Sequence, residues 1–201
     1  MNLPNKLTIF RIILVPIMAI IPFFNFDIKW IVIDIIFILA SITDKLDGYI
    51  ARSTNQITTF GKFLDPIADK ILVIVSMIIL VEHSKIPSWI PAIIIMREFI
   101  VSGYRLIAVE KKGEVVAASI WGKLKTVTQM IAIILAFIDT NPFGAIFTNS
   151  LTGYNFAINL IVTLMMIICV IATIFSGWDY IKNGKDLLKW HYKKQKKGLM
   201  N

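Results

Sequence analysis

The 201-residue sequence predicts an all-α protein that crosses a membrane six times. Apolar residues make up 57% of the chain and charged residues only 17%, whereas soluble domains average about 45–50% apolar residues. A helix needs about 20 mostly apolar residues to cross the hydrocarbon core of a bilayer. Six segments of roughly that length, separated by short polar breaks, cover about residues 7–24, 30–51, 61–82, 88–108, 121–138 and 155–177.

The first segment superficially resembles a signal peptide, because Lys6 and Arg11 lie near its start. It also contains Pro16 and Pro22, and no convincing small-residue cleavage site follows it. We therefore expect it to remain in the protein as the first span.

The breaks between the segments have the composition of turns, as in NFDIK, RSTNQITTF, EHSKIPS and EKKGEVVAAS. The break before the last segment, residues 139–154, is longer and rich in Asn, Pro, Gly and Thr. Because the linkers are short, we expect one compact six-helix domain over residues 1–181. A basic tail over residues 182–201 follows it.

The positions of the basic residues predict the orientation of the chain. With the N-terminus in the cytoplasm, six spans leave only Lys29 and Lys85 as basic residues on the other side. Lys and Arg concentrate on the cytoplasmic side of membrane proteins, so we expect both termini there. The membrane topology then explains the net charge of +8, and we expect no nucleic-acid partner. We expect the lysine-rich tail to be a plain stop-transfer segment without a specific function. Contact with anionic membrane lipids is a general effect, to which each basic residue adds about 1 kcal/mol.

Four aspartates lie where the second and third segments meet. Asp44 and Asp47 are three residues apart, and Asp65 and Asp69 are four apart, so each pair projects from one helical face. Each such charge costs about 2.5 kcal/mol or more at the bilayer centre, so a cluster requires compensation. A solvated interfacial loop does not account for this spacing. Carboxylates without His or Cys suit Mg²⁺ or Mn²⁺, which also bind phosphate oxygens. The pattern therefore predicts a metal site and a substrate that carries phosphates.

The same block contains glycines, which allow a backbone or a ligand to approach closely. It reads D-x-x-D-G-x-x-A-R, eight residues, then G-x-x-x-D-x-x-x-D, and in this form it resembles the signature of the CDP-alcohol phosphatidyltransferases. The fixed positions are filled by Asp44, Asp47, Gly48, Ala51, Arg52, Gly61, Asp65 and Asp69.

This resemblance implies a six-helix fold, often dimeric, with a polar cavity open to the cytoplasm. It also implies transfer of a phosphatidyl group from CDP-diacylglycerol to a small alcohol, with release of CMP. The stretches NLPNKLTIFRI, MREFIVSGYRL and VVAASIWGKLKTVTQM resemble the branch that uses glycerol 3-phosphate and makes phosphatidylglycerol phosphate. The last span and the tail add little to it. We expect a homodimer in a bacterial-type plasma membrane.

The resemblance also implies roles for individual residues. Asp44, Asp47 and Asp65 coordinate a pair of Mg²⁺ or Mn²⁺ ions with a contribution from Asp69, which is also the general base. The residues expected near the CDP-lipid are Asn5, Thr8, Arg11, Gly48, Ala51, Arg52 and Gly61.

A dianionic acceptor such as glycerol 3-phosphate requires cations on rigid elements. Arg97 and Arg105 are eight residues apart, about two helical turns, and can share one face. Arg97 lies deep in its segment beside Glu98, which favours a functional role. Flanking of spans by positive charge explains Arg105, Lys123 and Lys125 equally well. The candidate acceptor-binding residues are Lys62, Arg97, Arg105, Lys123 and Lys125.

Two other classes of protein use intramembrane aspartates. A prenyltransferase also binds a lipid diphosphate through Mg²⁺, but its two Asp-rich motifs usually lie far apart in sequence. A cation transporter or channel would use the aspartates as an ion site, yet the sequence lacks signs of an inverted repeat or broken helices. Within the family, inositol phosphate, inositol and serine remain alternative acceptors.

Overall fold

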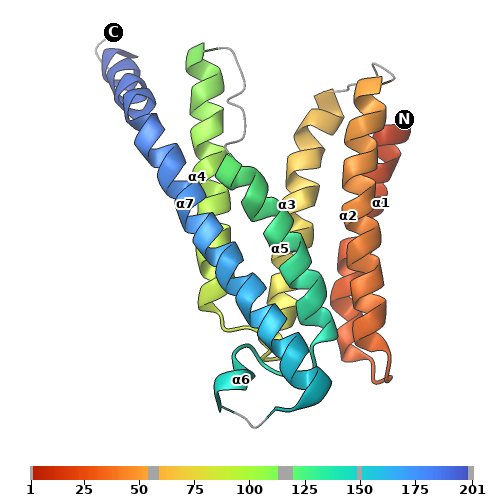
Figure 1. Ribbon diagram of the computed structural model, residues 1–201. Coiled ribbons are helices and arrows are strands. Elements are labelled where there is room, and N and C mark those ends of the chain that lie inside the picture. Colours follow the sequence, from red (N-terminus) through yellow and green to blue (C-terminus); the bar gives the residue numbers. More distant parts are fainter. Residues whose placement is uncertain (1, 54–58, 113–119, 149–150, 199–201) are drawn as a thin grey trace. The chain divides into compact units, whose positions relative to one another are not determined.

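The computed structural model consists of helices joined by short loops (Figure 1). The described residues, among which there is no strand, are 2–53, 59–112, 120–148 and 151–198. Each of the six predicted segments is confirmed as a helix, and one short helix, α6, is additional. The elements are α1 (Leu3–Ile20), η1 (Ile21–Phe23), α2 (Lys29–Ser53), α3 (Thr59–Glu82), α4 (Trp89–Lys112), α5 (Ile120–Ile138), α6 (Ala145–Thr148) and α7 (Gly153–Gly198).

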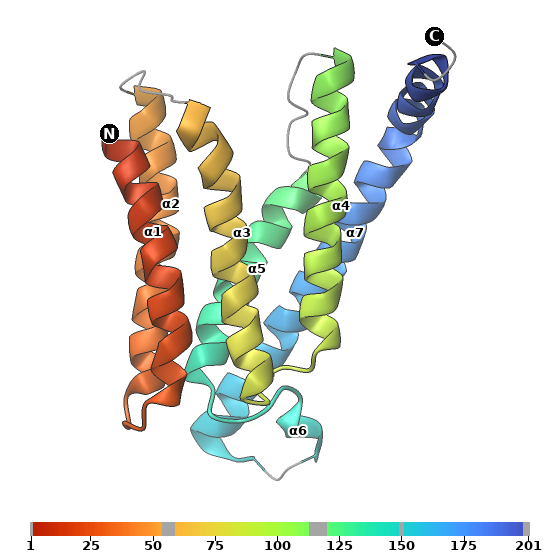
Figure 2. The same ribbon diagram turned by 180° about the vertical axis from the view of Figure 1, so that it is seen from behind.

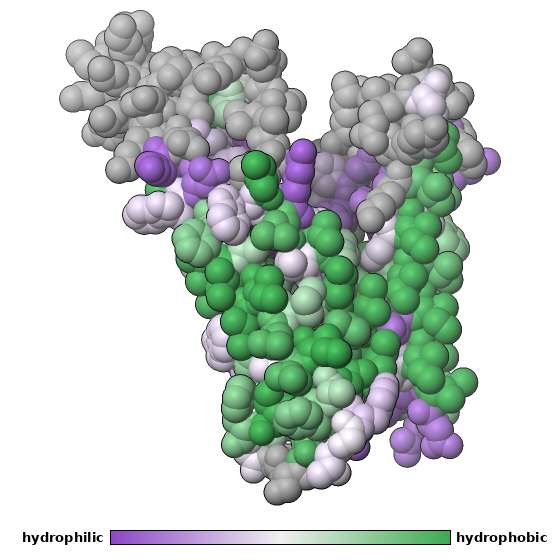
Figure 3. Space-filling model, in the orientation of Figure 1, coloured by the Kyte–Doolittle hydropathy of each residue, from purple (hydrophilic) through white to green (hydrophobic). Residues whose placement is uncertain are grey.

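The apolar character of the helices confirms the all-helical membrane fold but not the number of spans. In the described part of the chain, the stretches long and apolar enough to cross a bilayer are Asn5–Phe23, Ile120–Ile138 and Gly153–Lys182. Large apolar side chains cover much of the visible surface (Figure 3). The helices α2, α3 and α4 are interrupted by charged residues of the candidate site. The prediction of six spans is therefore not confirmed.

Contacts within the chain divide it into two units, which we describe separately. The first unit comprises Met1–Ser88 and Ile131–Thr163, and the second comprises Trp89–Met130 and Leu164–Asn201. The predicted boundary at residue 181 falls within the continuous helix α7 and stays a prediction.

In the first unit, α1 packs against both α2 and α3 (Figure 2). The buried face of α1 changes character along the helix. Its first half buries Thr8 and Arg11, whereas its second half buries Val15 and Met18. These residues follow the three- and four-residue spacing of one helical face. The apolar half anchors α1 in the core, and the polar half faces the aspartates described below.

A buried lysine follows the C-terminal end of α3, which is the end far from Asp65. Ser84 has a positive φ of 56°, and the amides of Ser84 and Lys85 donate to the carbonyls of Val81 and Leu80. This is the Schellman arrangement that ends many helices. It directs the chain back over α3 and leaves Lys85 buried.

The Lys85 ammonium donates to the carbonyl oxygens of Ala136, Phe137 and Asp139 at 3.2, 2.9 and 2.5 Å, and its nitrogen lies 4.2 Å from the Trp30 ring centroid. Burial lowers the pKa of Lys85 to about 8, while the charges of Asp139 and Asp34 oppose this decrease. We call the ammonium and its three carbonyl partners the Lys85 network. It ties the end of α3 to the end of α5.

The Asp139 carboxylate is itself bonded. Asn159 donates from its side-chain amide to Asp139 Oδ2 at 2.7 Å and to the Pro142 carbonyl at 2.9 Å. Nearby polar atoms are less well satisfied: within the described residues, Asp34 Oδ1 and His83 Nε2 are buried without a hydrogen-bond partner.

Candidate active site

The four aspartates of the signature come from adjacent ends of two helices. Asp44 and Asp47 lie near the C-terminal end of α2, while Asp65 and Asp69 lie in the first half of α3. Because α1 packs against both helices, its polar half lies next to the carboxylates.

Arg11 bridges the two aspartates of α2. Its Nη1 donates to Asp44 Oδ1 and its Nη2 to Asp47 Oδ2, both at 2.6 Å, and its Nε donates to the Ala40 carbonyl at 3.2 Å. The Arg11 side chain is 0% exposed, Asp47 is 3% exposed and Asp44 is 35% exposed. A buried charge needs such partners, because removing one of them leaves the other uncompensated.

Thr8 lies one turn before Arg11 and reaches the first aspartate of α3. Its hydroxyl donates to Asp65 Oδ1 at 2.8 Å, and a longer contact of 3.5 Å joins it to Asp47 Oδ2. One face of α1 therefore bonds to three aspartates that come from two other helices.

The remaining signature positions are described in part. Asp69 is half-buried, and Gly61 and Asn5 are buried. Gly48, Ala51 and Arg52 lie in α2 and Lys62 lies in α3, but their side chains fall outside the described part of the structure.

The donor atoms available at the aspartates suit a hard divalent cation, because they are carboxylate oxygens. No three carboxylate, imidazole or thiol groups among the described residues lie close enough together to form a metal site. The chemistry of the residues fits Mg²⁺ or Mn²⁺, and in this structure Arg11 and Thr8 bond to three of the four carboxylates.

The second unit contains the candidate acceptor-binding cations. Arg97 donates from Nη1 to Glu98 Oε1 at 3.2 Å and from Nη2 to the hydroxyl of Ser176. Lys125 donates to the same Glu98 oxygen, so Glu98 joins these two cations. Lys123 is exposed.

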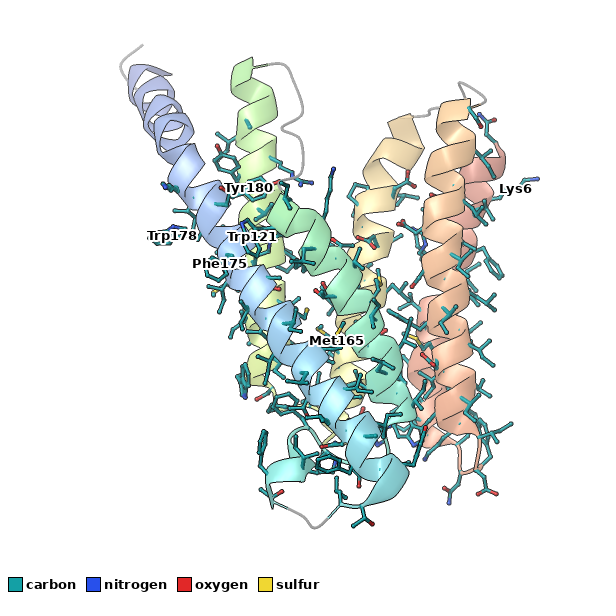
Figure 4. The ribbon with its side chains drawn as sticks, in the orientation of Figure 1. Lys6, Trp121, Met165, Phe175, Trp178 and Tyr180 are labelled. Atoms are coloured by element: carbon teal, nitrogen blue, oxygen red, sulfur yellow. The ribbon has the colours of Figure 1, made fainter. Side chains whose placement is uncertain are left out.

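Tyr180 connects the two arginines of α4. Arg105 Nη2 donates to the Tyr180 hydroxyl at 2.7 Å. The guanidinium carbons of Arg97 and Arg105 lie 5.8 and 5.4 Å from the centroid of its ring, so both arginines share the face of α4 that Tyr180 contacts. Figure 4 labels Tyr180 beside the stacked pair Trp121 and Phe175, whose ring centroids are 5.1 Å apart.

The two guanidinium groups are not fully satisfied. Within the described part of the chain, the Nε atoms of Arg97 and Arg105 are buried and lack a hydrogen-bond partner. Buried donors are nearly always paired, so these atoms are unusual.

Sequence reasoning missed Ser176 and Tyr180, because the last helix was thought to add little. The available signal was their spacing: two hydroxyl residues four apart lie on one face of the helix. Glu98 was noticed beside Arg97, but its contact with Lys125 was not predicted.

Comparison with known proteins gives a consistent result. The model of the CDP-alcohol phosphatidyltransferase family matches residues 1–178. The chain is 42% identical over 200 residues to the CDP-diacylglycerol–glycerol-3-phosphate 3-phosphatidyltransferase of Bacillus subtilis (strain 168), covering 94% of this chain and 97% of that protein. It is 38% identical over 191 residues to the protein of the same name from Haemophilus influenzae, covering 93% and 95% of the two chains.

Proposed function

Because this chain belongs to the CDP-alcohol phosphatidyltransferase family, we propose that it transfers the phosphatidyl group of CDP-diacylglycerol to glycerol 3-phosphate. The products are phosphatidylglycerol phosphate and CMP, a step in phospholipid biosynthesis. The observation that carries the proposal is the similarity, over nearly the whole of both chains, to relatives named for this reaction. The complete signature from Asp44 to Asp69 supports it.

In the proposed site, Asp44, Asp47 and Asp65, with a contribution from Asp69, would hold two Mg²⁺ or Mn²⁺ ions. When bound, these ions would offset the negative charge that develops on CMP as it leaves. Metal dependence is part of the proposal, and its support is the hard-oxygen character of the donors.

Asp69 is the proposed general base. Its carboxylate takes the proton of the acceptor hydroxyl, whose oxygen forms a bond to the phosphorus attached to diacylglycerol. The bond from that phosphorus to the CMP oxygen breaks, and CMP leaves with the electron pair. Asp69 lies one helical turn after Asp65 and is half-buried, which suits a group that must meet both the protein and a substrate.

The phosphate of glycerol 3-phosphate is assigned to the cations of the second unit. Arg97 and Arg105 share one face of α4 and are partly exposed, so their guanidinium groups can donate to a phosphate oxygen. Lys125 is less suited, because it is buried. Lys62 and Lys123 remain candidates from the sequence.

The other assignments also remain proposals. Asn5, Gly48, Ala51, Arg52 and Gly61 are assigned to the CDP-lipid by family resemblance. We further propose a homodimer in a bacterial-type plasma membrane, with the active site and both termini facing the cytoplasm. The basic residues along the sequence support that orientation.

The reaction is tested by measuring CMP release from CDP-diacylglycerol by the purified protein in detergent that contains lipid. Glycerol 3-phosphate, serine, inositol and inositol phosphate are offered separately, with Mg²⁺, with Mn²⁺ or with EDTA. We expect release only with glycerol 3-phosphate and a divalent cation. Release with another acceptor would reassign the branch, and equal release in EDTA would remove the metal from the mechanism.

Asp69→Asn tests the general base in the same assay. We expect a loss of about 100-fold or more in turnover, because general-base catalysis contributes about 10²–10⁴-fold, with unchanged elution in size-exclusion chromatography. Near-normal turnover would exclude Asp69 as the base.

A further inference from the structure

Arg11 occupies a position that a substrate-binding arginine would not. Its side chain is completely buried, and three acceptors from α2 surround it: Asp44, Asp47 and the Ala40 carbonyl. A residue that contacts the CDP-lipid must present part of its surface to that ligand, and Arg11 presents none.

We propose that Arg11 and Thr8 are positioning residues that orient Asp44, Asp47 and Asp65, the carboxylates proposed to bind divalent cations. This inference rests on the proposed metal-dependent function. It replaces, for these two residues, the expected contact with the CDP-lipid.

The shape of the guanidinium explains why an arginine stands here. Asp44 and Asp47 are one helical turn apart, and the two terminal nitrogens of Arg11 reach one carboxylate each at the same distance, 2.6 Å. The planar group presents its donors in a rigid fork, so the bonds set the direction of both carboxylates. A lysine carries the same charge on a flexible stem and cannot reproduce this geometry.

These bonds are compatible with metal binding. Arg11 uses Oδ1 of Asp44 and Oδ2 of Asp47, and Thr8 uses Oδ1 of Asp65 with a longer contact to Asp47. An ionised carboxylate has two oxygens and about four lone-pair sites, so a carboxylate bonded in this way can still bind a cation. Groups that orient metal ligands in this manner raise metal affinity.

The first helix is a suitable support for this role. Thr8 and Arg11 are three residues apart on the buried face of α1, and Val15 and Met18 continue that face into the apolar core. A site held by a well-packed helix is more accurately positioned than one held by a loop.

The substitution Arg11→Lys distinguishes a role of the charge from a role of the guanidinium geometry. If Arg11 acts only through its positive charge, replacing it with lysine changes nothing, because the charge is kept. If it positions the carboxylates, Arg11→Lys weakens cation binding although the charge is unchanged. We expect the affinity for Mn²⁺, measured by electron paramagnetic resonance without substrates, to fall by about 10- to 100-fold in Arg11→Lys.

Thr8 provides a second, milder pair of variants. Thr8→Val keeps the shape but removes the hydroxyl, and we expect Mn²⁺ affinity to fall by up to about 10-fold. Thr8→Ser keeps the hydroxyl and should stay within about twofold of the wild type. Lys6→Gln is the matched control, because Lys6 is an exposed cation of the same helix (Figure 4), and it should also stay within about twofold.

The outcomes separate this inference from the proposed function. Saturable Mn²⁺ binding by the wild type with equal affinity in Arg11→Lys and Thr8→Val would overturn the inference and leave the metal site standing. No saturable Mn²⁺ binding by the wild type would overturn both. Size-exclusion chromatography and thermal unfolding establish that each variant folds, and if Arg11→Lys does not, the Thr8→Val and Thr8→Ser pair decides.

Discussion

Lys85 is a buried cation, whereas Arg97 and Arg105 are partly buried, and the three differ in how completely they are bonded. An ammonium has three donors, and Lys85 gives one bond to each of three carbonyl oxygens. The two arginines each have a bonded terminal nitrogen but retain a buried Nε without a partner among the described residues. The first arrangement is complete within the protein, whereas the second retains unpaired donors.

We propose that this difference separates a structural cation from one that serves a substrate. Burying a charge is unfavourable in either case, so the presence of a buried cation does not reveal its role. Incomplete bonding is more informative, because protein interiors rarely leave a donor unpaired. We therefore expect substitutions at Lys85 to change stability and substitutions at the arginines to change the use of glycerol 3-phosphate.

The largest expected effect is a loss of stability in Lys85→Met. The substitution leaves three carbonyl oxygens without their donor and removes the positive charge near Asp139, and breaking a buried ionic arrangement costs about 3–5 kcal/mol. Chemical unfolding in detergent measures this change. The folded fraction should retain its KM for glycerol 3-phosphate.

Lys29→Met is the matched control for Lys85→Met. Lys29 lies 5.8 Å from the same Trp30 ring and is only half-buried, so we expect a change within about 0.5 kcal/mol. Equal destabilisation by the two substitutions would mean that the bonds of Lys85 are not the cause.

The next effect concerns catalysis. Arg105→Gln removes a charged donor that we assign to the acceptor phosphate, and hydrogen bonds to charged groups contribute about 1.5–3 kcal/mol. We expect kcat/KM for glycerol 3-phosphate to fall by about 10- to 150-fold, with little change in KM for CDP-diacylglycerol. If both constants changed equally, Arg105 would not be specific to the acceptor.

The pH dependence of stability sharpens the description of Lys85. Its pKa is lowered from 10.5 to about 8 in the folded protein, so between these values the unfolded chain binds a proton that the folded protein lacks. Stability rises with pH wherever the unfolded state binds more protons. The cost of burying this ammonium is therefore complete below about pH 8 and decreases as the pH rises.

Comparison of the wild type with Lys85→Met isolates this contribution. Between about pH 7.5 and pH 9.5, the stability of the wild type relative to the variant should rise by on the order of 1–2 kcal/mol. A constant difference would indicate that the three carbonyls keep the ammonium protonated in the folded protein throughout this range.

The sequence predicted the helices and the aspartate pairs because both depend on local spacing. Apolar segments gave the six helical regions, and the separations within the signature indicated which carboxylates share a helical face. The predicted number of spans was not confirmed, because charged residues interrupt α2, α3 and α4.

Partners distant in the chain could not be predicted in this way. Arg11 bonds to residues 33 and 36 positions away, and Arg105 bonds to Tyr180, 75 positions away. Helical periodicity tells which face a residue occupies but not which helix lies against that face. The role of the last helix as a source of hydrogen-bond partners for the arginines was missed for this reason.

Tyr180→Phe tests that role and has the smallest expected effect. The substitution keeps the ring beside both arginines and removes only the hydroxyl that accepts from Arg105. The hydroxyl orients Arg105 and is not assigned to the acceptor itself, so we expect only part of the contribution of a hydrogen bond to a charged group, a rise of about 2- to 12-fold in KM for glycerol 3-phosphate at nearly constant kcat. Trp178→Phe is the control, because Trp178 is an exposed aromatic residue of the same helix (Figure 4). If Tyr180→Phe lowered stability without changing KM, the hydroxyl would have a structural role, as Lys85 has, and no role in binding the acceptor.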